Sequence, residues 1–176
     1  RAAVEVLRDS GVLVCTVSGF PLGANLARIK GTEALMALHE GAREVDMVLN
    51  VGALKDGDDR AVASELWDLV HVCEEQGATS KVILETCLLS DEEKRRACRM
   101  CVEAGVGFVK TSTGFGGGGA TVEDIRLMAE AVAGAGLGVK ASGGIRSLAD
   151  LRAMVEAGAT RIGSSSGVKI MRELAE

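Results

Sequence analysis

Aromatic residues are scarce in this sequence of 176 residues, which has no tyrosine, one tryptophan and three phenylalanines. Positive charge is also in deficit, because 25 acidic residues outnumber 20 lysines and arginines and give a formal net charge of −5. Proteins that bind nucleic acid usually present a basic surface and stack bases on aromatic side chains. We therefore expect no nucleic-acid partner.

Long hydrophobic runs are absent too. No apolar stretch approaches the roughly 20 residues of a membrane-spanning helix, and the first ten residues are charged and amphipathic, unlike a signal peptide. We therefore expect a cytoplasmic protein with no membrane partner. With 47% hydrophobic and 26% charged residues, the sequence is typical of one globular domain spanning residues 1–176.

Residues that bind metals or form disulfides are few. The five cysteines are odd in number and irregularly spaced, which argues against a disulfide framework and favours reduced, mostly buried thiols. Cys98 and Cys101 form a C-x-x-C inside a helical pattern, with no second pair nearby. His39 and His71 have no ligand partners at metal spacing. We expect neither a metal site nor a redox site.

What the sequence does contain is a repeat of helix, glycine and apolar strand, at intervals of about 25 to 35 residues. Glycine suits the left-handed position that ends a helix, so each instance predicts a helix that leads directly into a strand. The glycines are Gly11, Gly41, Gly77, Gly105 and Gly158. The predicted strands span residues 13–17, 44–50, 81–85, 107–111, 138–141 and 161–163.

Helix starts are marked as well. Ser90, Thr121 and Ser147 each precede an acidic residue by three positions, just before an apolar-periodic run. The mostly apolar strands indicate a parallel sheet with both faces covered. Six strands that alternate with helices fit either a doubly wound open sheet or part of an eight-stranded α/β barrel, and periodicity alone does not choose between them.

Three charged residues interrupt the apolar strands: Asp46, Lys110 and Lys140. A buried charge is costly unless it is paired or functional, and the plain alternative is a buried ion pair. Against that alternative, two lysines would share one carboxylate. Two ammonium groups about 6 Å apart repel by roughly 3 kcal/mol at an effective dielectric of 20, which is about two pKa units. One lysine could then be a neutral amine that attacks carbonyls, with Asp46 moving protons.

Glycine- and serine-rich segments follow the last three strands, at residues 111–119, 142–146 and 163–166. Glycines let backbone N–H groups converge on an anion, and barrel enzymes often bind phosphate among their final loops. A run of four glycines could instead be a flexible linker. Three such segments after consecutive strands favour phosphate binding, and the absence of a nucleotide-binding motif argues against a nucleotide.

These residues resemble the deoxyribose-phosphate aldolase family. The matching segments run in family order and cover nearly the whole chain: residues 14–23 (VCTVSGFPLG), 44–50 (EVDMVLN), 81–86 (KVILET), 108–114 (FVKTSTG), 139–146 (VKASGGIR) and 161–166 (RIGSSS). The lysine of the KTSTG segment together with the later lysine before Gly-Gly is the most specific part of the resemblance.

The resemblance implies a TIM barrel that reversibly cleaves 2-deoxy-D-ribose 5-phosphate to D-glyceraldehyde 3-phosphate and acetaldehyde, without metal or organic cofactor. Lys110 would be the Schiff-base nucleophile, Lys140 the lysine that depresses its pKa, and Asp46 the carboxylate that relays protons through water. The phosphate would lie among Gly114, Gly143, Gly144, Arg146, Gly163, Ser165 and Ser166.

The sequence departs from the family pattern at its start. Family members begin with a strand that carries an Asp-His-Thr-Leu-Leu motif and a second strand with a cysteine, whereas this sequence opens at the helix that follows. About six of the eight strands are therefore expected, and the chain alone should self-associate and have little or no aldolase activity. Phe115 also stands where some members have a lysine near the phosphate.

Two other functions remain open at this point. The first is another Schiff-base sugar-phosphate aldolase, similar to transaldolase or fructose-bisphosphate aldolase. The second is a non-catalytic phosphate-binding barrel fragment. Homo-oligomer formation and aldehyde specificity are also open, because the sequence carries no feature that decides them.

Overall fold

The computed structural model describes residues 1–175 and shows six parallel strands that alternate with helices. The strands are β1 (Cys15–Ser18), β2 (Glu44–Val48), β3 (Thr79–Ile83), β4 (Phe108–Lys110), β5 (Gly138–Ser142) and β6 (Arg161–Gly163). The helices are α1 (Ala2–Leu7), α2 (Ala27–His39), α3 (Val51–Asp56), α4 (Asp59–Glu75), α5 (Asp91–Ala104), α6 (Val122–Ala131), α7 (Leu148–Glu156) and α8 (Gly167–Ala175), with a 3-10 turn at Thr86–Leu88. None of these helices has the length and apolar character needed to cross a membrane.

All six predicted strands are confirmed, with shifts of a few residues at their ends. The largest shift is in β3, which begins at Thr79, two residues earlier than expected, and ends at Ile83. Glu85 lies beyond the end of β3 in a left-handed backbone conformation, with φ 55°, which does not continue a strand. The expected strand end at Glu85 is therefore wrong.

The sheet is part of a closed-barrel architecture and not a doubly wound sheet. The strands lie in the order β1-β2-β3-β4-β5-β6 and every neighbouring pair is parallel, whereas a doubly wound sheet reverses its strand order at a switch point. Arg161 on β6 also lies 3.2 Å from Glu44 on β2, so the sheet curves far enough to bring these two strands face to face. Within residues 1–175, β1 and β6 each pair with only one strand, and the barrel is open between them.

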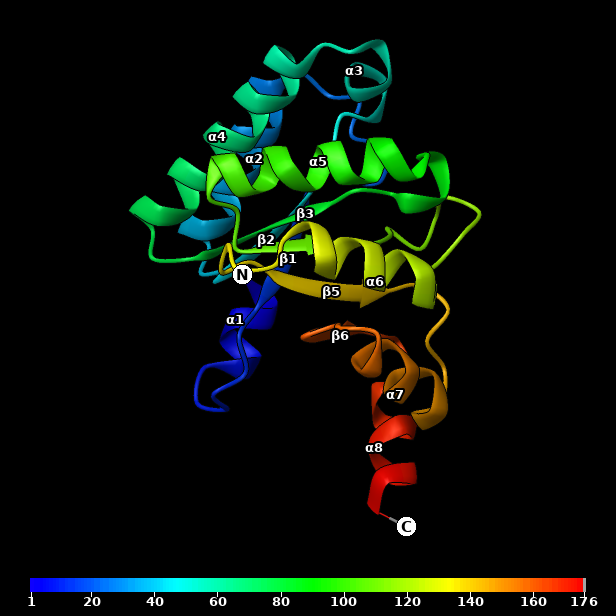
Figure 1. Ribbon diagram of the computed structural model, residues 1–176. Helices are drawn as coiled ribbons and strands as arrows, with labels where there is room; N and C mark the ends of the chain where they lie inside the picture. Colours follow the sequence, from blue (N-terminus) through cyan, green and yellow to red (C-terminus); the bar gives the residue numbers. More distant parts are fainter. Residues whose placement is uncertain (176) are drawn as a thin grey trace.

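Helices α2, α4, α5 and α6 cover the outer, convex side of the sheet, and α7 lies beside β6, whereas α1 and α8 project away from the sheet (Figure 1). Outward-pointing strand residues such as Val45, Met47, Val82 and Val109 are buried, and they join helix residues in one hydrophobic core. Inward-pointing residues of the same strands include Glu44, Asp46, Lys81, Lys110 and Lys140. Charges therefore replace many of the apolar side chains that usually fill the inside of a barrel.

Candidate active site

The three charged residues singled out in the strands come together inside the barrel. Lys110 Nζ lies 2.8 Å and Lys140 Nζ 2.6 Å from Asp46 Oδ2. The two lysines are paired in register on β4 and β5, and Asp46 reaches them from β2 on the opposite side of β3. All three side chains are largely buried, so their charges interact with little screening by water.

Burial and neighbouring charges shift the pKa of Lys110 below its usual value. Burial is the largest cause and lowers the pKa, Asp46 raises it by attraction, and Lys140 lowers it by repulsion. The expected effect of Lys140 is therefore present, but it is smaller than that of burial. Burial alone would raise the pKa of Asp46, yet Lys110 and Lys140 outweigh burial and hold this pKa well below its usual range. Asp46 is thus a carboxylate at neutral pH.

A second layer of charges lies below this trio and was not expected from the sequence. Lys81 Nζ is 2.8 Å from Glu44 Oε2 and 3.0 Å from Asp46 Oδ1, and Arg161 Nη1 is 3.2 Å from Glu44 Oε1. The expectation that Lys110 and Lys140 share one carboxylate is confirmed, and Lys81 binds the same carboxylate as a third cation. The spacing of Glu44 and Asp46, two residues apart on one strand, was the available signal that both point inward.

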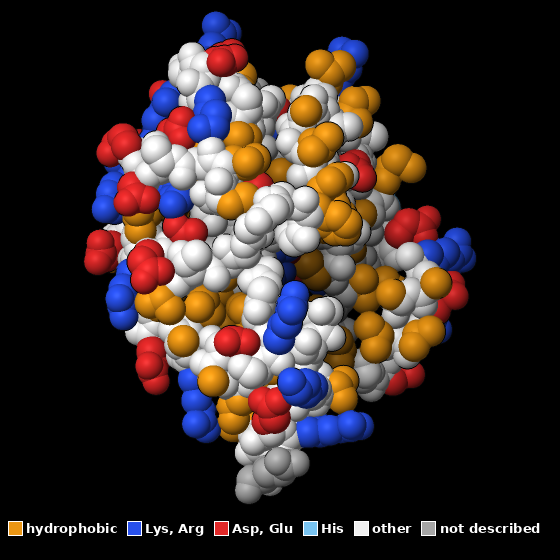
Figure 2. Space-filling view, turned by 90° about the vertical axis from the view of Figure 1, so that its right-hand side faces the viewer, with side chains coloured by type: hydrophobic (Ala, Val, Ile, Leu, Met, Phe, Trp, Pro, Cys, Tyr) orange, Lys and Arg blue, Asp and Glu red, His pale blue; other side chains and the backbone are white. Residues whose placement is uncertain are grey.

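Figure 2 looks onto the face at which the strands end, and this face is hollowed near its centre. The cavity there has a volume of about 530 Å³, within the usual range for small-molecule sites. It is lined by Lys110 and Lys140 and by six of the seven residues expected around a phosphate: Gly114, Gly143, Gly144, Arg146, Gly163 and Ser165. Ser112, Thr113, Phe115, Ser142, Ile145 and Ser164 also line it, and all six belong to the three segments predicted to bind phosphate.

Ser166 is the one residue expected around the phosphate that does not line the cavity. Its N–H donates to Ser164 Oγ at 2.9 Å, and its carbonyl accepts from the Ile170 N–H at 3.0 Å, so it forms the start of α8. The first N–H groups of a helix have no partner within the helix, and together with the exposed Arg146 they favour an anion at this end of the cavity.

The segment after Lys110 is held in place by Glu85. This buried carboxylate accepts from the Thr113 N–H at 3.3 Å and also from the Thr113 hydroxyl. Ser112, one residue earlier, is buried, and its hydroxyl oxygen has no hydrogen-bond partner. An unpaired hydroxyl beside a cavity is available to a ligand.

Metal and thiol chemistry find little support in residues 1–175. No group of three or more histidine, cysteine or acidic side chains there is arranged to hold a metal ion. The expectation that most thiols are buried is confirmed, because Cys73, Cys98 and Cys101 are buried, whereas Cys15 and Cys87 are exposed. Burial raises the pKa of Cys98 to about 12, which makes the thiol of this C-x-x-C unreactive.

Comparison with known proteins shows the family of the chain. The family pattern described as DeoC/LacD family aldolase matches residues 8–174. The deoxyribose-phosphate aldolase of Caldanaerobacter subterraneus subsp. tengcongensis is 58% identical over 172 residues, covering 97% of this chain and 74% of the relative. That of Staphylococcus carnosus is 56% identical over 174 residues, covering 99% and 78%.

Solved structures give the same result. The tetrameric deoxyribose phosphate aldolase from Aeropyrum pernix superimposes with a TM-score of 0.91 at 36% identity, over 99% of this chain and 73% of that one. A structure described as QR15, an aldolase, superimposes with a TM-score of 0.90 at 43% identity, over 98% and 78%.

Proposed function

The chain belongs to the DeoC/LacD family of aldolases, and on this basis we propose that it is a deoxyribose-phosphate aldolase that works through a Schiff base on Lys110. It reversibly cleaves 2-deoxy-D-ribose 5-phosphate into D-glyceraldehyde 3-phosphate and acetaldehyde. The single observation that carries the role of Lys110 is its position. Its buried amine has a lowered pKa, lines the cavity and contacts Asp46. A transaldolase-like or fructose-bisphosphate aldolase-like function is not supported by these relatives.

The chemistry starts with the neutral amine of Lys110. The amine adds to the C1 aldehyde of the open-chain sugar, and loss of water gives an iminium. Electrons of the C2–C3 bond then move into the iminium while the C3 hydroxyl loses its proton, which leaves an enamine on Lys110 and releases D-glyceraldehyde 3-phosphate. Protonation and hydrolysis of the enamine release acetaldehyde. Asp46, an anion beside both lysines, accepts and returns these protons through water.

Lys140 has an electrostatic role in this proposal. Its ammonium is next to Lys110 in register and repels a proton on Lys110, so that the neutral amine forms at lower pH. The phosphate of the sugar lies at the other end of the cavity, among Gly114, Gly143, Gly144, Arg146, Gly163 and Ser165. Ser166 supports this region from the start of α8 without lining it.

Reductive trapping tests the role of Lys110. Borohydride added with acetaldehyde should convert Lys110, and no other lysine, to an N-ethyl-lysine that peptide mass mapping locates. The matched control is Lys110→Met, which should remove the label. A label on Lys140 in the unsubstituted chain would reverse the two assignments. No label on any lysine would favour a non-catalytic phosphate-binding barrel.

Substitution of Arg146 tests the phosphate end. Because Arg146 is exposed at the rim, Arg146→Met should leave the fold intact. We expect it to raise the concentration of deoxyribose 5-phosphate that half-saturates trapping by about tenfold, as suits the loss of one charge-assisted contact. Unphosphorylated deoxyribose should trap as before. Equal losses with both sugars would show that the residue is structural.

Homo-oligomer formation remains part of the proposal. The Aeropyrum pernix relative is described as a tetramer. Sedimentation of this chain would measure its own state.

A further inference from the structure

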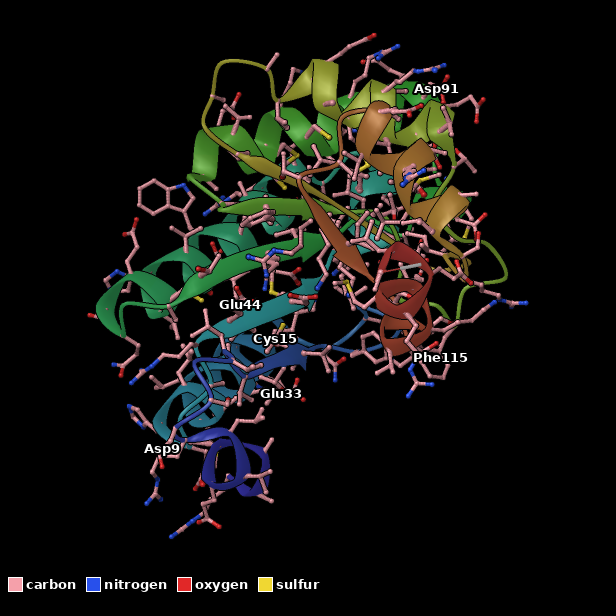
Figure 3. All side chains as sticks on the ribbon, turned by 90° about the horizontal axis from the view of Figure 1, so that it is seen from below. Asp9, Cys15, Glu33, Glu44, Asp91 and Phe115 are labelled. Carbon is pink, nitrogen blue, oxygen red and sulfur yellow. The ribbon has the colours of Figure 1, made fainter. Side chains whose placement is uncertain are left out.

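The layer below the two reactive lysines is organised around one side chain. Lys81 has no exposed surface, donates to Glu44 Oε2 at 2.8 Å and donates to Asp46 Oδ1 at 3.0 Å. It does not line the cavity, so it has no contact with a bound sugar. Figure 3 shows Glu44 and Cys15 side by side on the concave face of the sheet, on neighbouring strands.

We propose that Lys81 is a positioning residue that holds Asp46 in the orientation needed for proton transfer at Lys110, an inference that rests on the proposed function. The two oxygens of Asp46 have separate partners. Oδ1 accepts hydrogen bonds from Lys81 at 3.0 Å and from the Cys15 thiol at 3.1 Å. Oδ2 accepts hydrogen bonds from Lys110 and Lys140. Lys81 thus fixes the carboxylate from below and leaves the other oxygen directed at the reactive amine.

This division matters because the partners on Oδ2 change during the reaction. Lys110 passes from ammonium to neutral amine to iminium, and each step alters its hydrogen bond to Asp46. A carboxylate held only by Lys110 and Lys140 would be free to rotate at the moment when Lys110 stops being an ammonium. The bond to Lys81 does not change in any step, since Lys81 has no contact with the substrate.

The charges around Lys81 keep it protonated throughout. Burial alone would lower its pKa, but the bonds to Glu44 and Asp46 outweigh burial and raise the pKa above its usual value. Glu44 is itself held as an anion, because Lys81 and Arg161 overcome the effect of burial and lower its pKa. Besides these groups only the Cys15 thiol, 3.5 Å away, forms a hydrogen bond with the ammonium among the described residues, and the Lys81 charge also offsets part of the rise that burial causes in the pKa of Cys73 on α4. Lys81 is therefore a permanent cation next to the Asp46–Lys110 pair.

An ion pair that only stabilises the fold would show the same burial and the same hydrogen bonds. The test therefore needs a measured property that would not change if Lys81 only stabilised the fold. The pH dependence of acetaldehyde trapping on Lys110 is such a readout. Loss of the Lys81 charge should raise the pKa of Lys110, both because a nearby cation is gone and because Asp46 is freed to pair more closely with Lys110.

Three variants of the 176-residue chain separate the two explanations. Lys81→Met should move the pH midpoint of trapping upward by about one unit and lower the maximal rate about tenfold. Lys81→Met with Glu44→Gln also removes the carboxylate charge that would otherwise lose its lysine partner, and it should show the same two changes. Lys81→Arg keeps the charge but not the geometry, so its midpoint should stay while its maximal rate falls.

The outcomes are distinct. A folded Met variant, single or double, with the midpoint and maximal rate of the unsubstituted chain would overturn the proposal and leave a structural ion pair. If both Met variants fail to fold, Lys81→Arg decides, since a positioning role requires a lowered rate and a structural role does not. Failure of the proposed function is recognised separately, because the unsubstituted chain would then not be labelled on Lys110.

Discussion

At the scale of single residues, the reactivity of Lys110 depends on three opposing influences. Burial and Lys140 lower its pKa, and Asp46 raises it. Substituting either neighbour should therefore move the pH dependence of trapping, and the two shifts should have opposite signs. Opposite signs are a stricter test than a loss of activity, because general damage to the site would move both profiles in the same direction or not at all.

Lys140→Met should raise the pKa of Lys110, because it removes a repelling cation and leaves Asp46 Oδ2 with Lys110 as its one lysine partner. Trapping at neutral pH should fall about a hundredfold and should largely return at higher pH, where the neutral amine forms again. The measurement is the trapping rate from neutral to alkaline pH. A profile with an unchanged midpoint would refute the electrostatic role of Lys140.

Asp46→Asn should do the reverse. It removes the anion that stabilises the Lys110 ammonium, so the pKa of Lys110 should fall and the trapping midpoint should move to lower pH. The maximal rate should still decrease, since the amide cannot accept protons from the carbinolamine. The same pH series measures both quantities. A midpoint displaced upward, as for Lys140→Met, would contradict the assignment of Asp46 as the stabilising anion.

The sequence predicted the trio of Asp46, Lys110 and Lys140 because each is a charge inside an apolar run. Lys81 and Glu44 escaped this criterion for a physical reason. Each is the first residue of a predicted strand, where a charged side chain usually reaches water. Only the curvature of the sheet encloses the two side chains. Their partners are also distant in sequence, and Arg161, which binds Glu44, is 117 residues away from it.

At the scale of elements, the predicted helix starts agree with the structure better than the predicted charges did. Ser90 with Glu93 and Ser147 with Asp150 form the predicted capping boxes. Thr121 accepts from the Asp124 N–H, but the Asp124 carboxylate is bound by Lys94 of α5 at 2.6 Å. A contact between two helices thus replaced half of a local motif, which no pattern within one helix reveals.

The segments that follow β4 and β5 also form a unit. Ala120 N–H donates to the Gly143 carbonyl at 3.0 Å. A Cβ added to Gly119 would lie 2.5 Å from that carbonyl oxygen, closer than any real contact. A side chain at position 119 would force these backbone atoms to move apart. The two segments can therefore meet beside the cavity because this residue is glycine.

Gly119→Ala should therefore separate these segments and weaken anion binding. We expect a loss of about 1 to 3 kcal/mol in the free energy of unfolding, as for other overpacked sites. Inorganic phosphate, which should raise the melting temperature of the unsubstituted chain, should have little effect on the variant. The control is Gly31→Ala in α2, where an added Cβ meets nothing within 4 Å, and which should stabilise the chain by up to about 1 kcal/mol. Equal phosphate effects in Gly119→Ala and the unsubstituted chain would show that the contact is irrelevant to the anion.

At the scale of the whole molecule, the arrangement of the six strands could not be read from the repeat alone. An open doubly wound sheet and a barrel have the same alternation of strands and helices, and they differ in strand order and curvature. The choice of a barrel came from the family resemblance, and the parallel order β1 to β6 and the contact between β2 and β6 confirm it. The match to relatives spans 74 to 78% of their lengths in the two sequences compared above, in agreement with six strands of a larger barrel.

The open side of this barrel leads to the last prediction. β1 and β6 each have one unpaired edge within residues 1–175, and such edges invite pairing with another chain. Apolar side chains are exposed on the elements that border the opening. Leu13, just before β1, is 59% exposed, and Val168 and Met171 on α8 are 70% and 61% exposed.

A polypeptide of these 176 residues should therefore self-associate, and sedimentation velocity should show a species whose size grows with concentration. Leu13→Lys places a charge beside the β1 edge and should reduce this association. Trp67→Lys is the matched control, because Trp67 is 65% exposed on α4, on the covered outer side of the sheet, and should change nothing. We also expect little aldol turnover from this polypeptide although Lys110 is trapped, since trapping needs only Lys110 and the groups around it, whereas turnover needs an enclosed pocket. Addition of two further β/α units that close the sheet should give a species of fixed size with full turnover. A monodisperse monomer with full turnover and no such addition would contradict this account of the open barrel.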